Sequence, residues 1–268
     1  MRELERDLPS TSARSNVAVV GAGRLGRALV AALREVGYAV EGPLGRGAAP
    51  CGADVVLLCV PDREIAAAAA SLRRGALVGH CSGATGLEPL APHEAFSWHP
   101  LMTVTAQGAR FEGAGAAIAG STERALAMAR ELAAALGMQA VEVAEGDRVA
   151  YHAAACMASN FLITLEAAAE RLAATAGVDR VLLAPLVRAT VENWAALGPE
   201  RALTGPVARG DEDTVARQRA ELAARTPELL GLFDALAEAT RALVHDAAPP
   251  SGRRDAVQAP GALAGIRG

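Results

Sequence analysis

The sequence has 268 residues and a formal net charge of −4, and 51% of its residues are hydrophobic. This length suits one large domain or two modest ones, with enough chain to bury a core. The basic residues form no block, so nucleic acid is not an expected partner. No stretch is apolar enough to span a bilayer, so we expect no membrane partner either.

Cysteines and chain ends give the expected setting of the protein. Four cysteines (Cys51, Cys59, Cys81 and Cys156) show no zinc-ligand spacing, so we predict no metal site and a reducing, cytoplasmic location. Residues 1–15 have no apolar core of a secretory signal and are interpreted as a disordered leader. The Pro-, Gly- and Ala-rich residues 247–268 are interpreted as a disordered tail.

The first predicted element is a β-branched strand over residues 16–20. It enters a G-x-G-x-x-G turn, and a helix over residues 23–36 leaves it. In such a turn the first glycine permits the tight bend, the second lets a pyrophosphate approach the backbone, and the third lets the helix pack on the strand. The first helical N–H groups then point at the phosphates. We therefore predict a dinucleotide site; a plain strand–helix connector is the alternative. The site would comprise Gly21, Gly23, Arg24, Leu25 and Gly26.

The second predicted strand, residues 38–40, leads into the loop that distinguishes NAD from NADP. NAD sites place an acid at the tip of this strand for the ribose diol, whereas NADP sites use a nearby arginine. Glu41 lies early for the first role, and Arg46 lies in the loop where the second is played. We predict NADP in preference to NAD. The alternative is that Arg46 is a solvated loop residue.

Further strands are predicted over residues 53–60, 76–80, 96–101, 116–119 and 139–143, with a helix opening at residue 61 and another over residues 122–136. This alternation predicts an α/β fold with a doubly wound parallel sheet, a Rossmann domain spanning residues 16–146. Cofactors bind beyond the carboxyl ends of such strands. Val60 and Pro61 are therefore predicted to border the nicotinamide.

After residue 146 the pattern becomes helical. One long run covers residues 148–176, and further amphipathic helices follow to about residue 245. We predict a C-terminal all-helical domain over residues 147–246. Its long alanine-rich helices suggest a homodimer.

The polar residues His152, Cys156 and Asn160 follow at i, i+4 and i+8 on the first of these helices, with Ser159 beside them. This spacing places them on one face, and their neighbours are mostly apolar. A polar stripe of this kind must face water, a polar partner or a ligand. We interpret it as part of a substrate site. Hydrogen bonds to neighbouring helices are the alternative.

Three other residues are candidates for substrate chemistry. Ser82 follows the fourth strand, where its hydroxyl either holds a substrate carboxylate or stabilises a turn. His99 ends the fifth strand before Pro100 and is either an acid or a structural histidine. Arg209, in a glycine-containing loop, either pairs with an anionic substrate or is solvated.

Taken together, these pieces resemble the Rossmann-like and DUF2520 domain-containing proteins, relatives of the 6-phosphogluconate dehydrogenase-like and ketopantoate reductase-like superfamily. The resemblance spans about residues 16–245. It is carried by segments 21–26, 80–83, 99–101, 151–160, 184–186 and 203–211. It implies a Rossmann domain, a helical domain, NADP and often a dimer.

The wider superfamily uses a lysine and, four residues later, an asparagine on the first helix of the second domain. Asn160 matches the asparagine, whereas Cys156 stands at the lysine position. The usual proton donor is therefore absent. His152, or His99 from across the cleft, replaces it in our hypothesis, because histidine titrates near neutrality.

The leading hypothesis is an NADP-dependent oxidoreductase that reduces a small keto or imino acid such as ketopantoate. Asn160 and Ser82 would hold the anionic substrate, and His152 or His99 would supply the proton. One alternative is a catalytically silent NADP(H)-binding sensor, favoured by the missing lysine. Another is an interaction module that holds no nucleotide.

Overall fold

A computed structural model describes residues 15–45, 47–48 and 50–247. Arg46, almost all of the expected leader and the expected tail from residue 248 lie outside the described residues. The contacts divide the chain into two units, one ending at Leu162 and one beginning at Ile163. Each unit is described by itself.

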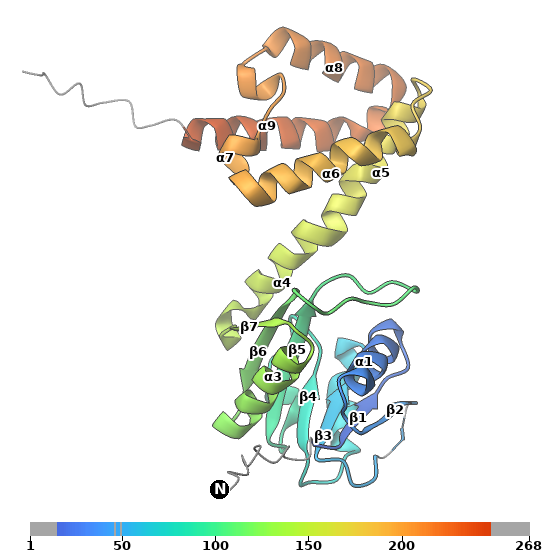
Figure 1. Cartoon of the computed structure of the whole chain (residues 1–268). Coiled ribbons are helices and arrows are strands. Elements are labelled where there is room, and N and C mark those ends of the chain that lie inside the picture. The colour runs from blue at the N-terminus through green and yellow to red at the C-terminus, as the bar shows by residue number, and fades with distance from the viewer. Residues whose placement is uncertain (1–14, 46, 49, 248–268) are drawn as a thin grey trace, which may run out of the picture. The chain divides into compact units, whose positions relative to one another are not determined.

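The first unit is built on a seven-stranded sheet with the order β2-β1-β3-β4-β5-β6-β7 (Figure 1). The first five strands in sequence run parallel to one another. The carboxyl ends of β1, β3, β4 and β5 therefore share one edge of the sheet, which is where ligands bind in such folds. The strands are β1 (Val17–Val20), β2 (Val40–Leu44), β3 (Val55–Leu58), β4 (Leu77–His80), β5 (Ala95–Leu101), β6 (Gly115–Gly120) and β7 (Gln139–Glu142).

The predicted doubly wound sheet is confirmed as mostly parallel, with one antiparallel pair that the strand pattern did not reveal. β6 runs antiparallel to β5, with Phe96 opposite Gly120 and Leu101 opposite Gly115. No helix connects these two strands in the described chain. A parallel pair needs a crossover connection, usually helical, whereas an antiparallel pair does not. β7 then pairs parallel with β6 after the helical crossover through α3 (Glu123–Ala135).

The second strand begins later than predicted. The expected residues 38–40 belong mostly to the turn after α1 (Arg24–Glu35), because Tyr38 N donates to Leu33 O and Tyr38 packs into the core. β2 pairs with β1 from Val40, opposite Val17, to Leu44, opposite Val20. Glu41 therefore lies inside the strand rather than at its tip.

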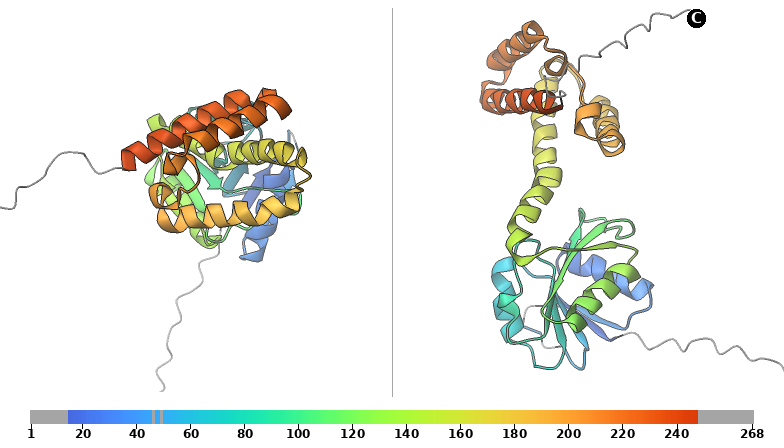
Figure 2. Two further views of the ribbon diagram at one scale, coloured as in Figure 1. Left: turned by 90° about the horizontal axis from the view of Figure 1, so that it is seen from above. Right: turned by 90° about the vertical axis from the view of Figure 1, so that its left-hand side faces the viewer.

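Both faces of the sheet are covered, which explains the nearly continuous apolar strands. In β1, Val17 and Val19 pack into the cluster that contains α1 and α3 side chains, whereas Ala18 and Val20 pack into a second cluster with α2 (Ile65–Ala70). The right-hand view of Figure 2 shows α2, in cyan, on one face and α1 and α3 on the other. Successive residues of these strands are all apolar because they face the two apolar clusters in turn.

Short helical turns and the long helix complete the first unit. The 3-10 turns are η1 (Asp62–Glu64), η2 (Glu88–Leu90) and η3 (Glu145–Asp147). The last of these turns, η3, leads into α4 (Arg148–Cys156) and a π-helical segment, η4 (Met157–Phe161). The predicted helical run does start at residue 148, but its first part belongs to the unit of the sheet. The domain boundary near residue 146 stays a prediction.

The second unit contains only helices among its described residues. They are α5 (Leu162–Ala174), α6 (Arg180–Leu197), α7 (Pro199–Ala202), η5 (Val207–Arg209), α8 (Glu212–Arg225), η6 (Pro227–Leu229) and α9 (Leu230–Ala247). Asp179 caps α6 and Asp211 caps α8, each accepting from a backbone N–H of the first turn. Over the described residues, no helix has the length and apolar character needed to cross a membrane.

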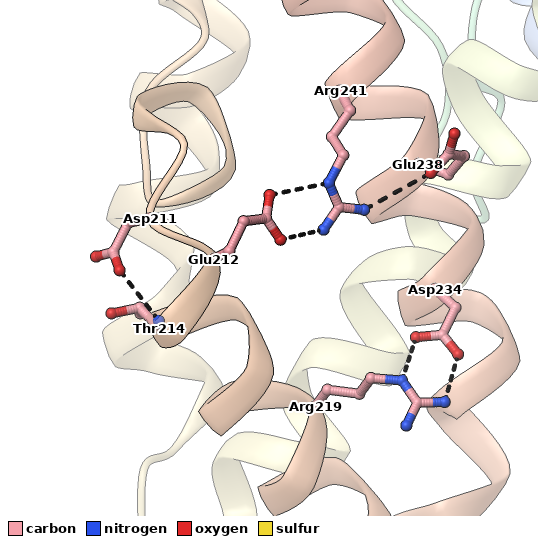
Figure 3. A network of polar contacts seen from close by, with 7 residues as sticks. All are labelled: Asp211, Glu212, Thr214, Arg219, Asp234, Glu238 and Arg241. Atoms are coloured by element: carbon pink, nitrogen blue, oxygen red, sulfur yellow. Dashed lines mark hydrogen bonds and ion pairs between the residues drawn. The ribbon is translucent and has the colours of Figure 1, made fainter.

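Ion pairs link α8 to α9 (Figure 3). Arg219 donates two hydrogen bonds of 2.8 Å to the carboxylate of Asp234. Arg241 pairs in the same two-pronged way with Glu212, at 3.1 and 2.7 Å. The planar guanidinium fits a carboxylate in this geometry. Such a pair attracts the two helices and also fixes their register.

Candidate functional site

The glycine turn after β1 has the geometry that the motif requires. Gly21 has a φ of +117°, and a Cβ there would lie 2.2 Å from the carbonyl oxygen of Cys59. A Cβ on Gly26 would lie 1.9 Å from the carbonyl oxygen of Gly21. Both positions therefore need glycine so that the turn, β3 and α1 can approach closely.

The start of α1 is open to an anion. A Cβ on Gly23 would meet no atom within 4 Å, so the space in front of this residue is free. Gly23 is also the N-cap of α1, and no side chain caps the first N–H groups of the helix. Free N–H groups and the helix dipole favour a phosphate here. Arg24 and Leu25 open the helix, with Arg24 exposed.

Val60 and Pro61 follow β3 at the same edge of the sheet. Val60 is half-buried and Pro61 is exposed. The adjoining Cys59 donates its N–H to Val20 O at 2.7 Å, which holds this segment beside the glycine turn. The residues present thus fit a dinucleotide: a glycine cradle, an uncapped helix start and a partly apolar wall.

Glu41 is engaged within the protein, since its carboxylate accepts a hydrogen bond from the backbone N–H of Cys51 at 3.2 Å. The residue after the last residue of β2 is Gly45, followed by Arg46. The strand tip therefore carries no acid of the kind that binds a ribose diol in NAD sites. The predicted partner of a 2′-phosphate, Arg46, is outside the described residues.

A cavity of about 460 Å³ lies between the end of β5, the segment after it and the helix formed by α4 and η4. Its volume is in the range of small-molecule sites. The structure brings together here His99, His152 and Asn160, three of the four residues predicted for catalysis. The lining residues are His99, Leu101, Met102, Thr103, Tyr151, His152, Ala154, Ala155, Cys156, Ala158, Ser159 and Asn160.

His99 occupies the centre of a ring cluster. Its Nδ1 lies 2.8 Å from the hydroxyl oxygen of Tyr151, and its ring meets those of Tyr151 and His152 edge-on, at centroid separations of 5.6 and 5.8 Å. Burial and the charges of His152 and Arg148 lower the pKa of His99 to about 4. The imidazole is therefore neutral at pH 7, which argues against His99 as an imidazolium acid.

Gly83 makes room for the two imidazoles. A Cβ on this residue would lie 2.6 Å from Cδ2 of His152 and 3.0–3.1 Å from Cε1 and Nε2 of His99. The loop after β4 thus comes directly against both rings. Sequence reasoning gave Gly83 no role of its own. The contact with the two rings is what requires glycine at this position, and such a contact is not visible in the sequence.

Arg148, the first residue of α4, is fully buried and was missed by sequence reasoning. It donates to Ser97 Oγ at 2.8 Å and to the carbonyl oxygen of Ser82 at 3.0 Å. Burial lowers the pKa of Arg148, and nearby Glu145 opposes that shift. An arginine at a helix start looks like a surface residue in the sequence, so no signal marked it as buried.

Ser82 is committed to the loop after β4. Its hydroxyl donates to Asp62 Oδ2 at 2.8 Å and accepts from Thr85 N at 3.0 Å. It does not line the cavity described above. These contacts favour the turn role over the substrate role that the sequence left open.

His80 lies beneath this loop and has a fixed tautomer. Its Nδ1 accepts from Ser82 N at 3.2 Å, so Nε2 carries the proton and donates to Gly86 O at 2.8 Å. Burial lowers the pKa of His80. This neutral imidazole, with both ring nitrogens hydrogen-bonded, supports the loop.

The π-helical segment η4 carries Ser159 and Asn160 into the cavity wall beside Cys156. Single π turns inside helices occur often at functional sites. A regular α-helical spacing was assumed from the sequence, which holds no signal for the wider turn. Arg209, by contrast, ends η5 in the second unit and is exposed.

All four cysteines are free thiols. Within residues 15–45, 47–48 and 50–247, no cluster of three or more His, Cys, Asp or Glu side chains is arranged to hold a metal ion.

Residues 114–240 match a family described as Domain of unknown function (DUF2520). The chain therefore contains this domain, and the predicted resemblance to Rossmann-like and DUF2520 domain-containing proteins is confirmed. A search of curated proteins gave no match.

Solved structures resemble the chain over most of its length. A proposed NADP oxidoreductase from Bacteroides fragilis has 20% identity and a TM-score of 0.73, covering 85% of this chain and 98% of its own. A protein from Thermotoga maritima has 26% identity and a TM-score of 0.71, with coverages of 86% and 98%. An NADPH-bound reductive aminase from Aspergillus terreus has 15% identity and a TM-score of 0.62, with coverages of 87% and 99%. These likenesses confirm the fold class, a Rossmann-like part followed by a helical region.

Proposed function

The chain is a Rossmann-like protein with a DUF2520 domain, and we propose that it is an NADP-dependent oxidoreductase that reduces a small keto or imino acid. One observation carries the proposal. The open glycine cradle after β1 and the histidine-lined cavity after β5 lie at the same, carboxyl edge of one sheet. Doubly wound enzymes use this edge to bring a dinucleotide and a substrate together.

Each part of the site has a role in this proposal. Gly21, Gly23 and Gly26, with Arg24 and Leu25, hold the pyrophosphate, and Val60 and Pro61 border the nicotinamide. Arg46 binds the 2′-phosphate. When bound, the cofactor supplies a hydride to the substrate carbon. Asn160 holds the substrate, and His152 or His99 supplies the proton.

The electrostatics favour an anionic substrate. Among the described residues no carboxylate lines the cavity, whereas the buried guanidinium of Arg148 donates to neutral groups of Ser97 and Ser82. Arginine keeps its proton in proteins, and the charge of Arg148 raises the local potential, which nearby Glu145 offsets in part. The carboxylate of a keto or imino acid is stabilised by that potential.

A catalytically silent NADP(H) sensor is the second candidate. The observation that favours it is Cys156, a cysteine in the cavity wall at the position where the resembled superfamily has a lysine. A sensor binds the dinucleotide with the same cradle but does not oxidise NADPH when keto or imino acids are added.

Binding is the first test. Thermal unfolding of the full chain with NADP(H) and NAD(H) in parallel should show a rise in Tm, larger for the phosphorylated cofactors, since ligands stabilise the state that binds them. Arg46→Gln should weaken NADPH binding about tenfold, the effect of losing one charge-assisted hydrogen bond, and leave NADH binding unchanged. Arg110→Gln, at an exposed residue paired with Glu112, is the matched control. Equal affinities of NADPH and NADH would contradict the NADP assignment.

Turnover separates the two candidate functions. NADPH oxidation is followed by absorbance with a panel of small keto acids, including ketopantoate, and of keto acids mixed with amines. A reductase consumes NADPH with at least one of them. Tight NADPH binding without consumption across the panel would favour the sensor.

A further inference from the structure

We propose that Tyr151 is a positioning residue that fixes the tautomer of His99, so that His99 presents a neutral Nε2–H to the reacting oxygen or nitrogen of the substrate. The inference rests on the proposed function and deepens it. It divides the work of the two histidines: His99 is a hydrogen-bond donor, and His152 is the proton source.

The contact that carries the proposal joins two different elements. Tyr151 comes from the first turn of α4 and His99 from the end of β5, and their Oη and Nδ1 atoms lie 2.8 Å apart. This is a normal distance for a hydrogen bond of a phenol to an imidazole. Both side chains are half-buried, and both line the cavity.

The surroundings of His99 determine its charge. Burial, His152, Arg148 and His80 disfavour the imidazolium, and only Asp62 favours it, with the net result that the pKa of His99 falls to about 4. Tyr151 packs on the same ring, and burial raises the pKa of its hydroxyl while Arg148 lowers it. Both groups are therefore neutral at pH 7. A neutral imidazole has one N–H and one bare nitrogen.

The direction of the hydrogen bond follows from the available acceptors. If Tyr151 donates, Nδ1 is the bare nitrogen and Nε2 carries the proton. In the reverse arrangement Nδ1–H donates to the phenol oxygen, and the phenol O–H then needs another acceptor. Among the described residues, Tyr151 Oη has no hydrogen-bond partner except His99. The first arrangement leaves only Nε2–H without a partner in the protein, whereas the reverse leaves both the phenol O–H and a bare Nε2 without one, so the first is favoured.

Nε2 of His99 is placed to reach a ligand. His99 lines the cavity, and its ring packs closely on Gly83, where a Cβ would lie 3.1 Å from this atom. Nε2 is not among the side-chain nitrogens that are sealed from solvent without a partner. It has no hydrogen bond to any described residue, in contrast to Nδ1.

A neutral N–H donor suits the reduction of a carbonyl or imine. Hydride addition to the carbon moves the π electron pair onto the oxygen or nitrogen, which then carries the developing negative charge. A preorganised donor aimed at that atom stabilises the charge more than it stabilises the substrate. In this division of work, His152 donates the proton that completes the product.

Nitrogen NMR of the full chain tests the tautomer directly. With ¹⁵N-labelled histidine in the NADP⁺-saturated protein, the five histidines are assigned from single His→Gln variants. At pH 7, His99 should show a protonated Nε2 and a bare Nδ1. In Tyr151→Phe the His99 signals should move toward a mixture of tautomers. Tyr38→Phe is the matched control, because its hydroxyl donates instead to Glu131 at 2.9 Å, and it should leave His99 unchanged.

Two results would overturn the proposal: a protonated Nδ1 in the unmodified protein, or the same His99 spectrum in Tyr151→Phe. Turnover gives a second readout. With NADPH and a keto acid that the enzyme reduces, Tyr151→Phe should lower kcat about tenfold, a fraction of the 10²–10³ lost with a whole donor, and leave the Kd of NADPH unchanged. An unchanged kcat would also contradict the proposal.

Failure of the proposed function is distinguishable from failure of this inference. If no keto or imino acid drives NADPH oxidation, the reductase proposal fails, and with it the role of Nε2–H toward a substrate. The tautomer and its dependence on Tyr151 are still read from the spectrum in that case. If turnover is present but the spectrum does not depend on Tyr151, only this inference fails.

Discussion

The chemistry of the candidate site depends on a few side chains that lie close to the buried guanidinium of Arg148. Arg148 is buried without a carboxylate bonded to it, His99 is neutral beside it, and Gly83 gives both imidazoles their space. Each of these residues depends on another: the arginine charge helps to keep His99 neutral, and a neutral His99 can accept a hydrogen bond from Tyr151. Changing one should therefore alter the protonation of the others.

The lowered pKa of His99 predicts an acid-sensitive fold. The unfolded chain has a histidine of ordinary pKa, near 6.5, whereas the folded chain has one near 4. Between these values the unfolded state binds more protons, so the free energy of unfolding falls as the pH drops from about 6.5 toward 4. Urea unfolding at pH 7 and pH 5 should show this loss, and His99→Gln should reduce it. His80, whose pKa is also lowered, should account for part of the loss that remains in His99→Gln.

His245→Gln is the control for this measurement. His245 is exposed near the end of α9, so its replacement should leave the loss between pH 7 and pH 5 as in the unmodified protein. Equal losses in His99→Gln and the unmodified protein would show that His99 is not held neutral by its surroundings.

At the scale of elements, the helices of the second unit depend on directed polar contacts. Few residues of α8 are buried, and its apolar contact to the rest of the unit is carried by Val215 and Leu222. This small core does not specify the register of α8 against α9. The two-pronged pairs of Arg219 with Asp234 and Arg241 with Glu212 do so (Figure 3). Exposed pairs are weak, so they set register more than they set stability.

Removal of one pair should therefore have a small, salt-dependent effect. Arg219→Gln leaves Asp234 without its partner and should lower Tm by a few degrees or less at low salt, and by less in 1 M NaCl, where exposed charges are screened. Arg188→Gln is the matched control, because Arg188 is exposed on α6 and has no ion pair with the described residues. A Tm loss that is independent of salt would contradict an electrostatic origin.

At the scale of the whole molecule, exposed apolar side chains are the main unexplained feature of the single chain. No residue of α6 is buried, and Val181, Leu182, Leu186 and Trp194 expose 69%, 66%, 65% and 57% of their surface. Apolar surface of this extent on one helix is typical of protein–protein interfaces. It supports the proposal of a homodimer, in which a second copy covers α6.

Size-exclusion chromatography with light scattering tests the homodimer. The unmodified chain should have twice the mass of one copy. The double variant Leu182→Glu, Leu186→Glu should shift it toward one copy, because two buried carboxylates without partners oppose association. Arg188→Glu, a charge change on the same helix at a polar position, is the control. A single-copy mass for the unmodified chain would contradict the proposal.

Much of the fold was predictable because it is encoded locally. The glycine turn, the apolar strands and the capped amphipathic helices each show their structure over a few residues. The sequence therefore predicted the Rossmann-like sheet, the helical second part and the start of the helical run at residue 148. It also placed His152, Cys156 and Asn160 on one surface. The cavity confirms that these three lie together with His99; their catalytic roles stay predictions.

What the sequence by itself determined was thus the order of elements and the residues at the carboxyl edge of the sheet, since period and turn chemistry act over short distances. Only the tertiary structure decided the antiparallel β5–β6 pair, the engagement of Ser82 with Asp62, the burial of Arg148 and the hydrogen bond between Tyr151 and His99. Each of these depends on segments far apart in the chain. Burial and the identity of a hydrogen-bond partner are properties of the packed molecule, and no local pattern carries them.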